Sequence, residues 1–209
     1  MSTQISLDIP HLIARVKLVF QSPRQCWDTI SAETDTPTAV LMKTIAPLTC
    51  VGIVATVIGF QVFGINVPFF GTWRPGLIAS FFQQAIYGAI IIGALFLDAW
   101  ILQKLAPQFG GSVSYDRAFS LAAHASIPAV TARLLGIFPQ LLFASPLLAI
   151  FSVVVLFHGV GKMVSIPEEK RSTFFGVSLV AMLLAHIILG ALVFDLSPTP
   201  FNDIGSIGH

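Results

Sequence analysis

Three ionisable side chains inside apolar stretches are the first candidates for chemistry. Asp98, His124 and His158 each lie within seven residues of a basic side chain that ends such a stretch. If the stretches span a membrane, the three lie at similar depth. A carboxylate and two imidazoles can share a proton, form a hydrogen-bonded cluster or, at the extreme, ligate a metal. The favoured alternative is structural: Asp98 reaches the headgroups, and each histidine bonds the backbone of a neighbouring helix.

A second polar group lies toward the opposite ends of the same stretches. It consists of Arg133 and the glutamines Gln61, Gln83 and Gln84. The Arg133 guanidinium suits an anionic lipid headgroup or a substrate carboxylate. Its structural alternative, again favoured, is to reach the interface and bind the last carbonyl groups of its own helix. His186 has no charged residue at matching depth, so we expect a neutral, packed imidazole there.

Signatures of the common enzyme classes are absent from the sequence. It contains no glycine-rich nucleotide-binding loop, no Cys/His zinc spacing, no nucleophile elbow and no pair of carboxylates in one apolar stretch. The net charge of +1 provides no basic surface for nucleic acid. We therefore expect no enzymatic activity and no catalytic residues, metal, cofactor or nucleic-acid partner.

Five apolar stretches must position these side chains. Each is close to or above the ~20 residues with which a helix crosses a hydrocarbon core. Hydrophobic residues make up 55% of the chain and charged residues 10%, which leaves too little polar surface for a soluble globule. The predicted fold class is an all-α polytopic membrane protein with a bundle of five transmembrane helices. The stretches cover residues 40–63, 76–104, 115–136, 141–164 and 173–196, and together form the predicted domain 40–196.

The distribution of basic residues indicates the orientation of these spans. Only Arg74 and Arg133 fall on the side opposite to the N-terminus. By the positive-inside rule, the N-terminus is predicted to be cytoplasmic and the C-terminus periplasmic or lumenal. We therefore expect a multi-pass protein of the inner (cytoplasmic) membrane with a periplasmic tail at 197–209. The basic residues on the N-terminal side are Arg15, Lys17, Arg24, Lys43, Lys104, Arg117, Lys162, Lys170 and Arg171.

Residues 1–39 are predicted to form a cytoplasmic pair of amphipathic helices. Apolar residues recur at helical spacing up to Phe20, and Ser22 with Pro23 begins a second helix. The pattern fits a helix pair on the lipid headgroups and a pair packed on the bundle equally well. Cys26 and Cys50 are expected to be reduced, with Cys26 the more accessible. The residues predicted at the membrane surface are Arg15, Lys17, Phe20, Arg24 and Trp27.

Small residues spaced four apart predict where the helices approach closely. Because the third span carries the longest such series, we expect it to be central. Pro128 in this span lacks an amide hydrogen and should bend the helix near the middle of the bilayer. The small residues are Ala55 and Gly59 in the first span, Ala89 and Gly93 in the second, and Ala118, Ala122 and Ser126 in the third.

Several short motifs extend over nearly the whole chain. They are Leu18-Val19-Phe20-Gln21-Ser22-Pro23 with Trp27, Phe109-Gly110-Gly111-Ser112, His124-Ala125-Ser126-Ile127-Pro128, Leu156-Phe157-His158-Gly159-Val160 and Ile166-Pro167-Glu168-Glu169-Lys170-Arg171. Together they resemble the bacterial branch of the Yip (Ypt-interacting protein) domain family. His124 stands where that family usually has tyrosine, which argues against one fixed chemical role for the position.

The resemblance implies a five-helix membrane domain with a cytoplasmic N-terminus. Its eukaryotic relatives contact small GTPases through their cytoplasmic N-terminal regions. Residues 1–39 contain no extended acidic arm, so no GTPase partner is inferred.

Two functional hypotheses follow from the sequence. The preferred one is a non-enzymatic membrane scaffold or accessory subunit that associates with membrane lipids, with other membrane proteins or with itself. The alternative is a small transporter, channel or lipid-moving protein that uses Asp98, His124 and His158 as a proton-linked site. This alternative predicts a water-accessible cavity that opens to the cytoplasm and contains these side chains.

Overall fold

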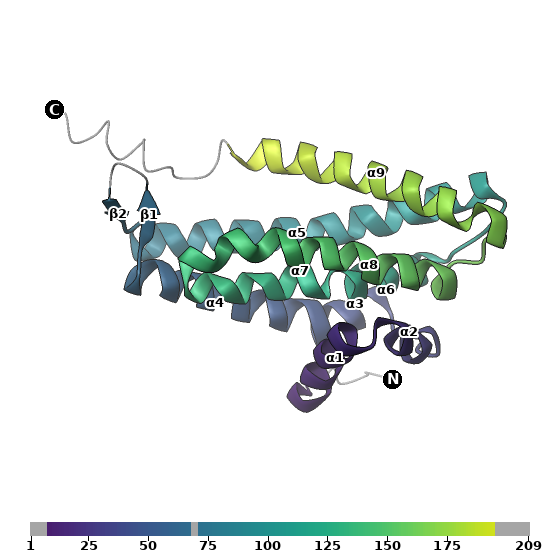
Figure 1. Ribbon diagram of the computed structural model, residues 1–209, viewed down its shortest axis with the longest axis horizontal. Helices are drawn as coiled ribbons and strands as arrows, with labels where there is room; N and C mark the ends of the chain where they lie inside the picture. Colours follow the sequence, from purple (N-terminus) through teal and green to yellow (C-terminus); the bar gives the residue numbers. More distant parts are fainter. Residues whose placement is uncertain (1–7, 68–70, 195–209) are drawn as a thin grey trace.

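The structure, a computed structural model, describes residues 8–67 and 71–194 and is almost entirely helical (Figure 1). Within these described residues, four helices are long and apolar enough to cross a membrane, and a fifth span results if one bent pair of helices counts as a unit. The predicted fold class is therefore confirmed. The elements are α1 (Ile9–Gln21), α2 (Pro23–Ser31), α3 (Pro37–Val40), η1 (Leu41–Ile45), α4 (Ala46–Val62), β1 (Ile65–Val67), β2 (Gly71–Trp73), α5 (Leu77–Leu105), η2 (Ala106–Phe109), α6 (Tyr115–Ala125), α7 (Ile127–Thr131), η3 (Ala132–Ile137), η4 (Pro139–Ala144), α8 (Ser145–Met163) and α9 (Glu168–Phe194).

The bundle has two distinct ends (Figure 1). The hairpin end carries the antiparallel strands β1 and β2, in which Ile65 pairs with Trp73. The platform end carries α2, η2 and the first residues of α6 and α9, and consecutive spans run in opposite directions between the two ends. Residues 1–7, the predicted end of the last span beyond Phe194 and the predicted tail 197–209 lie outside the described residues.

The third span is bent by 43° between α6 and α7. Pro128 lies in the first turn of α7 and has no amide hydrogen, so it cannot continue the hydrogen-bond pattern of α6. The Ser126 hydroxyl at the break donates to the carbonyl oxygen of Ala123 at 2.8 Å and so satisfies a backbone acceptor at the end of α6. The bend predicted from Pro128 is confirmed.

The helix α6 forms the centre of the bundle. Every residue from Ala118 to Ala125 is buried, and α6 packs against α5, α8 and α3. Small side chains allow this because they let neighbouring helix backbones approach closely. The predicted central position of the third span is confirmed.

Close approach of the first and third spans depends on two glycines. A Cβ atom on Gly59 of α4 would overlap the carbonyl oxygen of Gly136 in η3, so the prediction for this stripe is correct. The corresponding prediction for α5 is wrong. Ala89 and Gly93 are exposed, and a Cβ on Gly93 would meet nothing within 4 Å. The glycine of α5 that faces α4 is Gly88.

The second N-terminal helix packs onto the side of the bundle. The Trp27 side chain of α2 is fully buried, and its indole nitrogen donates to the carbonyl oxygen of Val155 in α8 at 2.8 Å. Phe20 at the end of α1 stacks on Phe151, with ring centroids 5.6 Å apart. Of the two arrangements that the sequence left open, the structure therefore has α2 packed on the bundle.

Two of the residues predicted at the membrane surface are buried instead. Trp27 has no exposed surface, and the Arg15 guanidinium forms a short ion pair with Glu33, which follows α2. Charge neutralisation by Glu33 allows Arg15 to be buried, a possibility that amphipathic periodicity alone does not reveal. Lys17 and Arg24 are exposed, as a membrane-surface role requires.

The predicted accessibility of the two cysteines is reversed. Cys26 is buried beneath α2, whereas Cys50 is on the outer surface of α4, and both are free thiols. Burial raises the pKa of the Cys26 thiol to about 11 because the apolar surroundings disfavour the thiolate.

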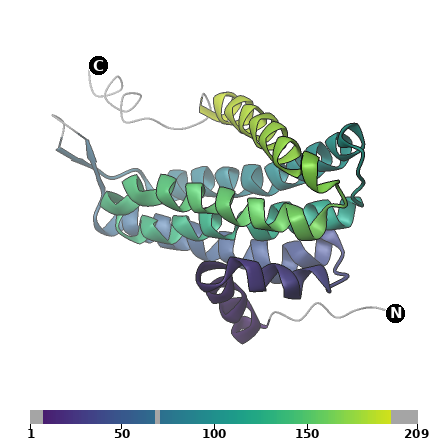
Figure 2. The same ribbon diagram turned by 45° about the vertical axis from the view of Figure 1, so that its right-hand side comes forward.

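The last helix, α9, is attached to the bundle along one side. It packs on α5, and less extensively on α8 and η2, and then diverges from the other helices toward the hairpin end (Figures 1 and 2). Much less of α8 and α9 is buried within the bundle than of the first two spans. We call the side next to α9, where helix packing is sparse, the open side of the bundle.

Candidate functional site

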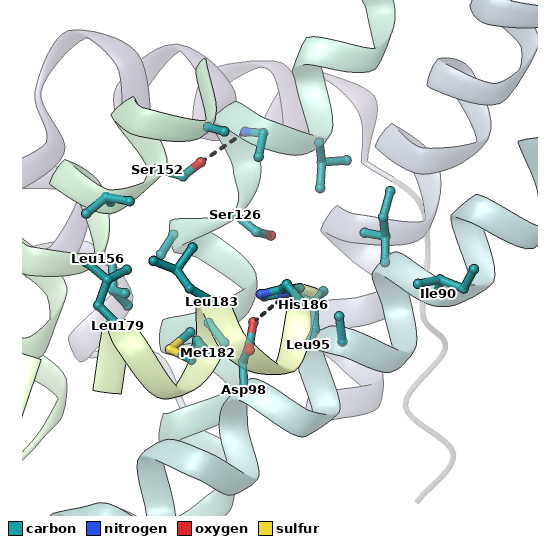
Figure 3. Close-up of a pocket in the computed structure, with 18 residues that line it drawn as sticks. Ile90, Leu95, Asp98, Ser126, Ser152, Leu156, Leu179, Met182, Leu183 and His186 are labelled. Atoms are coloured by element: carbon teal, nitrogen blue, oxygen red, sulfur yellow. Dashed lines mark hydrogen bonds and ion pairs between the residues drawn. The ribbon is translucent and has the colours of Figure 1, made fainter. Parts of the chain in front are cut away.

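A cavity of about 370 Å³ lies between α9 and the remainder of the bundle. Its walls come from α5, the bent span α6–α7, α8 and α9, and are mainly alanine, leucine, isoleucine and valine (Figure 3). Four polar side chains, Asp98, Ser126, Ser152 and His186, interrupt this apolar lining. The Ser152 hydroxyl accepts the amide hydrogen of Ala129 at 3.0 Å and so satisfies a backbone donor just after the bend.

Asp98 and His186 form the polar centre of this cavity. Oδ2 of Asp98 lies 3.5 Å from Nε2 of His186, an ion pair when the imidazole is protonated (Figure 3). The Asp98 side chain is only 7% exposed, and its Oδ1 has no hydrogen-bond partner among the described residues. The His186 side chain is 45% exposed, so the cavity reaches the surface of the protein beside α9.

The sequence did not identify His186 as the partner of Asp98. In the sequence, the membrane depth of Asp98 is counted from Lys104, the basic residue that ends its apolar stretch. The helical path of α5 continues beyond Lys104, through η2 to Phe109, and Phe109 packs edge-on against Phe174 of α9. From this aromatic contact, Asp98 lies eleven residues back along the chain and His186 twelve residues forward. The matched spacing in two antiparallel helices brings their side chains together, and the Phe109–Phe174 contact is the signal that fixes the register.

The structure does not bring together the three residues of the predicted Asp98–His124–His158 cluster. His124 is buried, and its Nδ1 bonds the Ser120 carbonyl oxygen at 2.9 Å. His158 is half-buried on α8, and its Nδ1 bonds the Val154 carbonyl oxygen of its own helix at 2.8 Å. The cavity contains Asp98 but neither of these histidines. In the part of the chain that the structure describes, no group of three His, Cys, Asp or Glu side chains is arranged to hold a metal ion.

A second cavity, of about 640 Å³, lies toward the hairpin end and contains Arg133. The Arg133 guanidinium donates a short hydrogen bond to Oε1 of Gln84 and lies 5.9 Å from the centre of the Tyr87 ring, a cation–π distance. The cavity is also lined by Thr56 and Ser145. Arg133 and Gln84, predicted to lie at the same depth, are therefore in direct contact.

The two other predicted glutamines lie elsewhere. Gln61 donates to the carbonyl oxygen of Pro75 at 3.0 Å and to the Ser80 hydroxyl at 3.2 Å, and so ties α4 to the beginning of α5. Gln83 is half-buried and lines neither cavity. Gln61 therefore has a structural role, and only Gln84 accompanies Arg133.

The two cavities adjoin each other within the bundle. Ile91 of α5, Ala129 of α7 and Ala149 of α8 line both of them. Together the cavities extend from Arg133 near the hairpin end to the Asp98–His186 pair. This arrangement can accommodate a molecule with one charged end and a long apolar part.

Comparison with known proteins connects this architecture to a family. The model of the Yip1 domain matches residues 17–191, which is most of the chain. The chain belongs to the Yip1 family. Neither a curated protein sequence nor a solved structure matches it. The resemblance found in the sequence is thus confirmed for the family, whereas assignment to its bacterial branch stays a prediction.

The glycine motifs of this Yip1 domain have structural explanations. Gly110 has a φ angle of 74°, which residues with a side chain rarely adopt, and a Cβ on Gly111 would overlap the Ser165 backbone. A Cβ on Gly159 would lie 2.5 Å from two atoms of the Trp27 ring. These glycines therefore allow the α5–α6 loop to pair with the α8–α9 loop, and α2 to pack on α8.

Proposed function

We propose that this Yip1 domain protein is a non-enzymatic scaffold or accessory protein that binds another membrane component, a protein or a lipid, on the open side of its helix bundle. Multi-pass membrane localisation and membership of the Yip1 family, which is not known for enzymatic activity, support this role. Yip1 membership also favours membrane-protein interactions in general. The proposed partners are lipids, other membrane proteins or a second copy of the chain.

The cavity beside α9 is the observation that carries the proposal. Its lining is apolar, yet Asp98 and the half-exposed His186 face it within a membrane-spanning region. Polar groups that face hydrocarbon cost free energy unless they are covered or hydrated. A bound component on the open side of the bundle would cover this pair and the sparsely buried faces of α8 and α9.

Photo-crosslinking from neighbouring positions of α9 tests the proposal. Leu183 lines the cavity and is 51% exposed, whereas Leu184 is 56% exposed and does not line it. A photoreactive amino acid is placed at each position, and the protein is irradiated after extraction in mild detergent, which removes bulk lipid. We expect a discrete lipid or protein adduct from position 183 and none from position 184. A strictly monomeric protein with no retained lipid and no adduct from either position would contradict the proposal.

A transport or lipid-moving function is the second candidate, and the adjoining cavities favour it. They connect a cationic side chain at one end with a carboxylate–imidazole pair at the other. In reconstituted vesicles, this function predicts lipid or proton flux that falls in Asp98→Asn and His186→Gln variants. His158→Gln is the matched control, because His158 lies outside both cavities. Flux that is absent, or unaffected by the first two substitutions, would exclude this function.

We propose that the protein lies in the inner membrane with its platform end facing the cytoplasm. Basic side chains support this, because Lys162 and Arg117 lie at the platform end, where Lys162 pairs with Asp28 and Arg117 binds backbone carbonyl oxygens. Reporter fusions to the two termini test the orientation. A cytoplasmic reporter should be active at the N-terminus and a periplasmic reporter at the C-terminus, and the opposite pattern would overturn it.

A further inference from the structure

We propose that the two adjoining cavities bind one anionic amphiphile, whose acidic headgroup lies on Arg133 and whose apolar chain extends toward Asp98 and His186. The inference rests on the proposed function, that the protein binds another membrane component, and names the chemistry of that component. The ligand has a carboxylate or phosphate at one end and a hydrocarbon chain at the other.

The positive charge of Arg133 is unmatched among the described residues. Its guanidinium contacts a neutral amide on Gln84 and the ring face of Tyr87, and no carboxylate in residues 8–67 or 71–194 pairs with it. Its Nε atom is buried and has no hydrogen-bond partner within the same residues. A cation within a membrane span is costly when it is not paired. The site therefore favours an anion.

The chemistry of guanidinium indicates which anions fit. Arg133 carries five N–H donors in a planar fork, which binds carboxylate and phosphate groups through two parallel hydrogen bonds. Gln84 uses its amide oxygen to accept from Arg133, so it orients the guanidinium without neutralising it. A carboxylate or phosphate headgroup would supply both the missing charge and the missing acceptor.

The apolar cavity indicates that the anion carries a hydrocarbon chain. Apart from Asp98, Ser126, Ser152 and His186, the lining of the 370 Å³ cavity is alanine or larger apolar side chains. Volumes of about 300–1,000 Å³ with few polar groups are typical of small-molecule sites. A free inorganic anion would occupy only the region around Arg133 and leave this apolar surface uncovered.

The length of the paired cavities fits one chain lying along α5. Gln84 and Asp98 are fourteen residues apart in this helix, which corresponds to ~21 Å at 1.5 Å per residue. One leaflet of a bilayer has a hydrocarbon thickness of ~15 Å. A chain anchored at Arg133 therefore has room to extend past the middle of the membrane to the Asp98–His186 pair.

Ala149 provides a way to close the path without touching Arg133. It lines both cavities and is exposed, so a phenylalanine there enters the junction of the cavities. Ile150, the next residue of α8, is 63% exposed and lines neither cavity. Ala149→Phe and Ile150→Phe thus add the same side chain to one helix at adjacent positions, one inside the path and one outside it.

The experiment measures lipid retention by native mass spectrometry. Full-length protein is transferred from nanodiscs of phosphatidylcholine that contain added phosphatidylglycerol or added oleate, and soluble phosphate is the probe without a chain. We expect the wild type to retain phosphatidylglycerol or oleate in preference to phosphatidylcholine, and to show no response to phosphate. Retention should fall at least about tenfold in Arg133→Gln, because a charge-assisted contact is lost. It should fall in Ala149→Phe and remain unchanged in Ile150→Phe.

The outcomes separate this inference from the proposed function. Equal retention of anionic and neutral lipid, or unchanged retention in both Arg133→Gln and Ala149→Phe, overturns the anionic site but leaves a lipid-binding scaffold. A further outcome is that the wild type retains no anionic lipid while an Asp195→Asn/Asp203→Asn variant does. In that case the chain's own carboxylates pair with Arg133, which also overturns the inference. A wild type that retains no lipid and forms no adduct from position 183 contradicts the proposed function itself. Thermal unfolding of each variant in phosphatidylcholine identifies any variant that fails to fold.

Discussion

Replacing Gly159 with alanine should displace the Trp27 ring and loosen the attachment of α2 to the bundle. An added Cβ would lie 2.5 Å from Cε2 and Cζ2 of Trp27 and 2.5 Å from Cδ1 of Leu121. Neither neighbour can move easily, because both side chains are fully buried and the indole nitrogen is bonded to the Val155 carbonyl oxygen. The new methyl group must therefore shift α2 or α8.

Two opposing effects determine the size of the change. Overpacking of a well-filled core costs about 1–3 kcal/mol. Alanine is favoured over glycine within a helix by about 1 kcal/mol. Gly159→Ala should therefore lower the free energy of unfolding by up to about 2 kcal/mol. Gly161 is the matched control on the same helix, since its added Cβ would lie no closer than 3.5 Å to another side chain. Gly161→Ala should leave stability unchanged or raise it by up to about 1 kcal/mol.

Denaturant unfolding in detergent, followed by Trp27 fluorescence, provides the assay. The chain has three tryptophans, so Trp73 and Trp100 are first replaced by phenylalanine. Gly159→Ala should shift the emission toward that of an exposed indole and lower the unfolding midpoint, whereas Gly161→Ala should do neither. In a Trp27→Phe background, whose ring is smaller, the cost of Gly159→Ala should shrink; unfolding of this variant, which has no tryptophan, is followed by circular dichroism. Equal effects of the two alanines would refute the proposed contact between Trp27 and Gly159.

Three further predictions concern burial and close packing. With Cys26 as the only cysteine, the folded protein should resist maleimide at neutral pH. Because burial raises the pKa of the Cys26 thiol to about 11, the free energy of unfolding should be constant below about pH 8.5 and fall as the pH rises toward 11. Rapid maleimide labelling of the folded protein would contradict the burial of Cys26. Glu33→Gln should destabilise the protein by about 3 kcal/mol, because it leaves Arg15 buried and unpaired. An Arg15→Met/Glu33→Gln variant should recover part of the loss, and thermal unfolding that shows no recovery argues against charge burial as the cause. Gly59→Ala should lower the unfolding midpoint, because the added methyl group overlaps the backbone of the third span. Gly93→Ala should not, because Gly93 has open space around it. Indistinguishable midpoints would disprove the close approach of the first and third spans.

The spans and the bend were accessible from the sequence because they depend on local properties. A helix must be about 20 apolar residues long to cross the bilayer, so composition along the chain marks the spans. Pro128 lacks an amide hydrogen wherever it is placed, so the bend near Ser126 follows from residue type. The shared depth of Arg133 and Gln84 was predicted in the same way, by counting residues along their helices, whereas the contact between their side chains was not.

Other features depend on which helices meet. Helical periodicity shows that Trp27 lies on an apolar face but does not distinguish lipid from protein as its environment. Gly159 of α8, more than 100 residues away in the chain, makes the space that Trp27 fills. Ala89 and Gly93 have the spacing of a helix contact, yet they are exposed. Small residues do not bring helices together where no helix lies opposite them.

The sequence by itself determined that this protein crosses a membrane as a helical bundle, where its third span bends, and which charged side chains lie at membrane depth. Hydrophobicity, proline geometry and spacing are properties of each segment alone, so they need no partner to be read. The tertiary structure alone decided that Asp98 pairs with His186 rather than with His124 or His158, and that Arg133 faces a cavity adjoining theirs. These pairings depend on the register between helices, which the Phe109–Phe174 contact and the glycine contacts set only once the chain is folded.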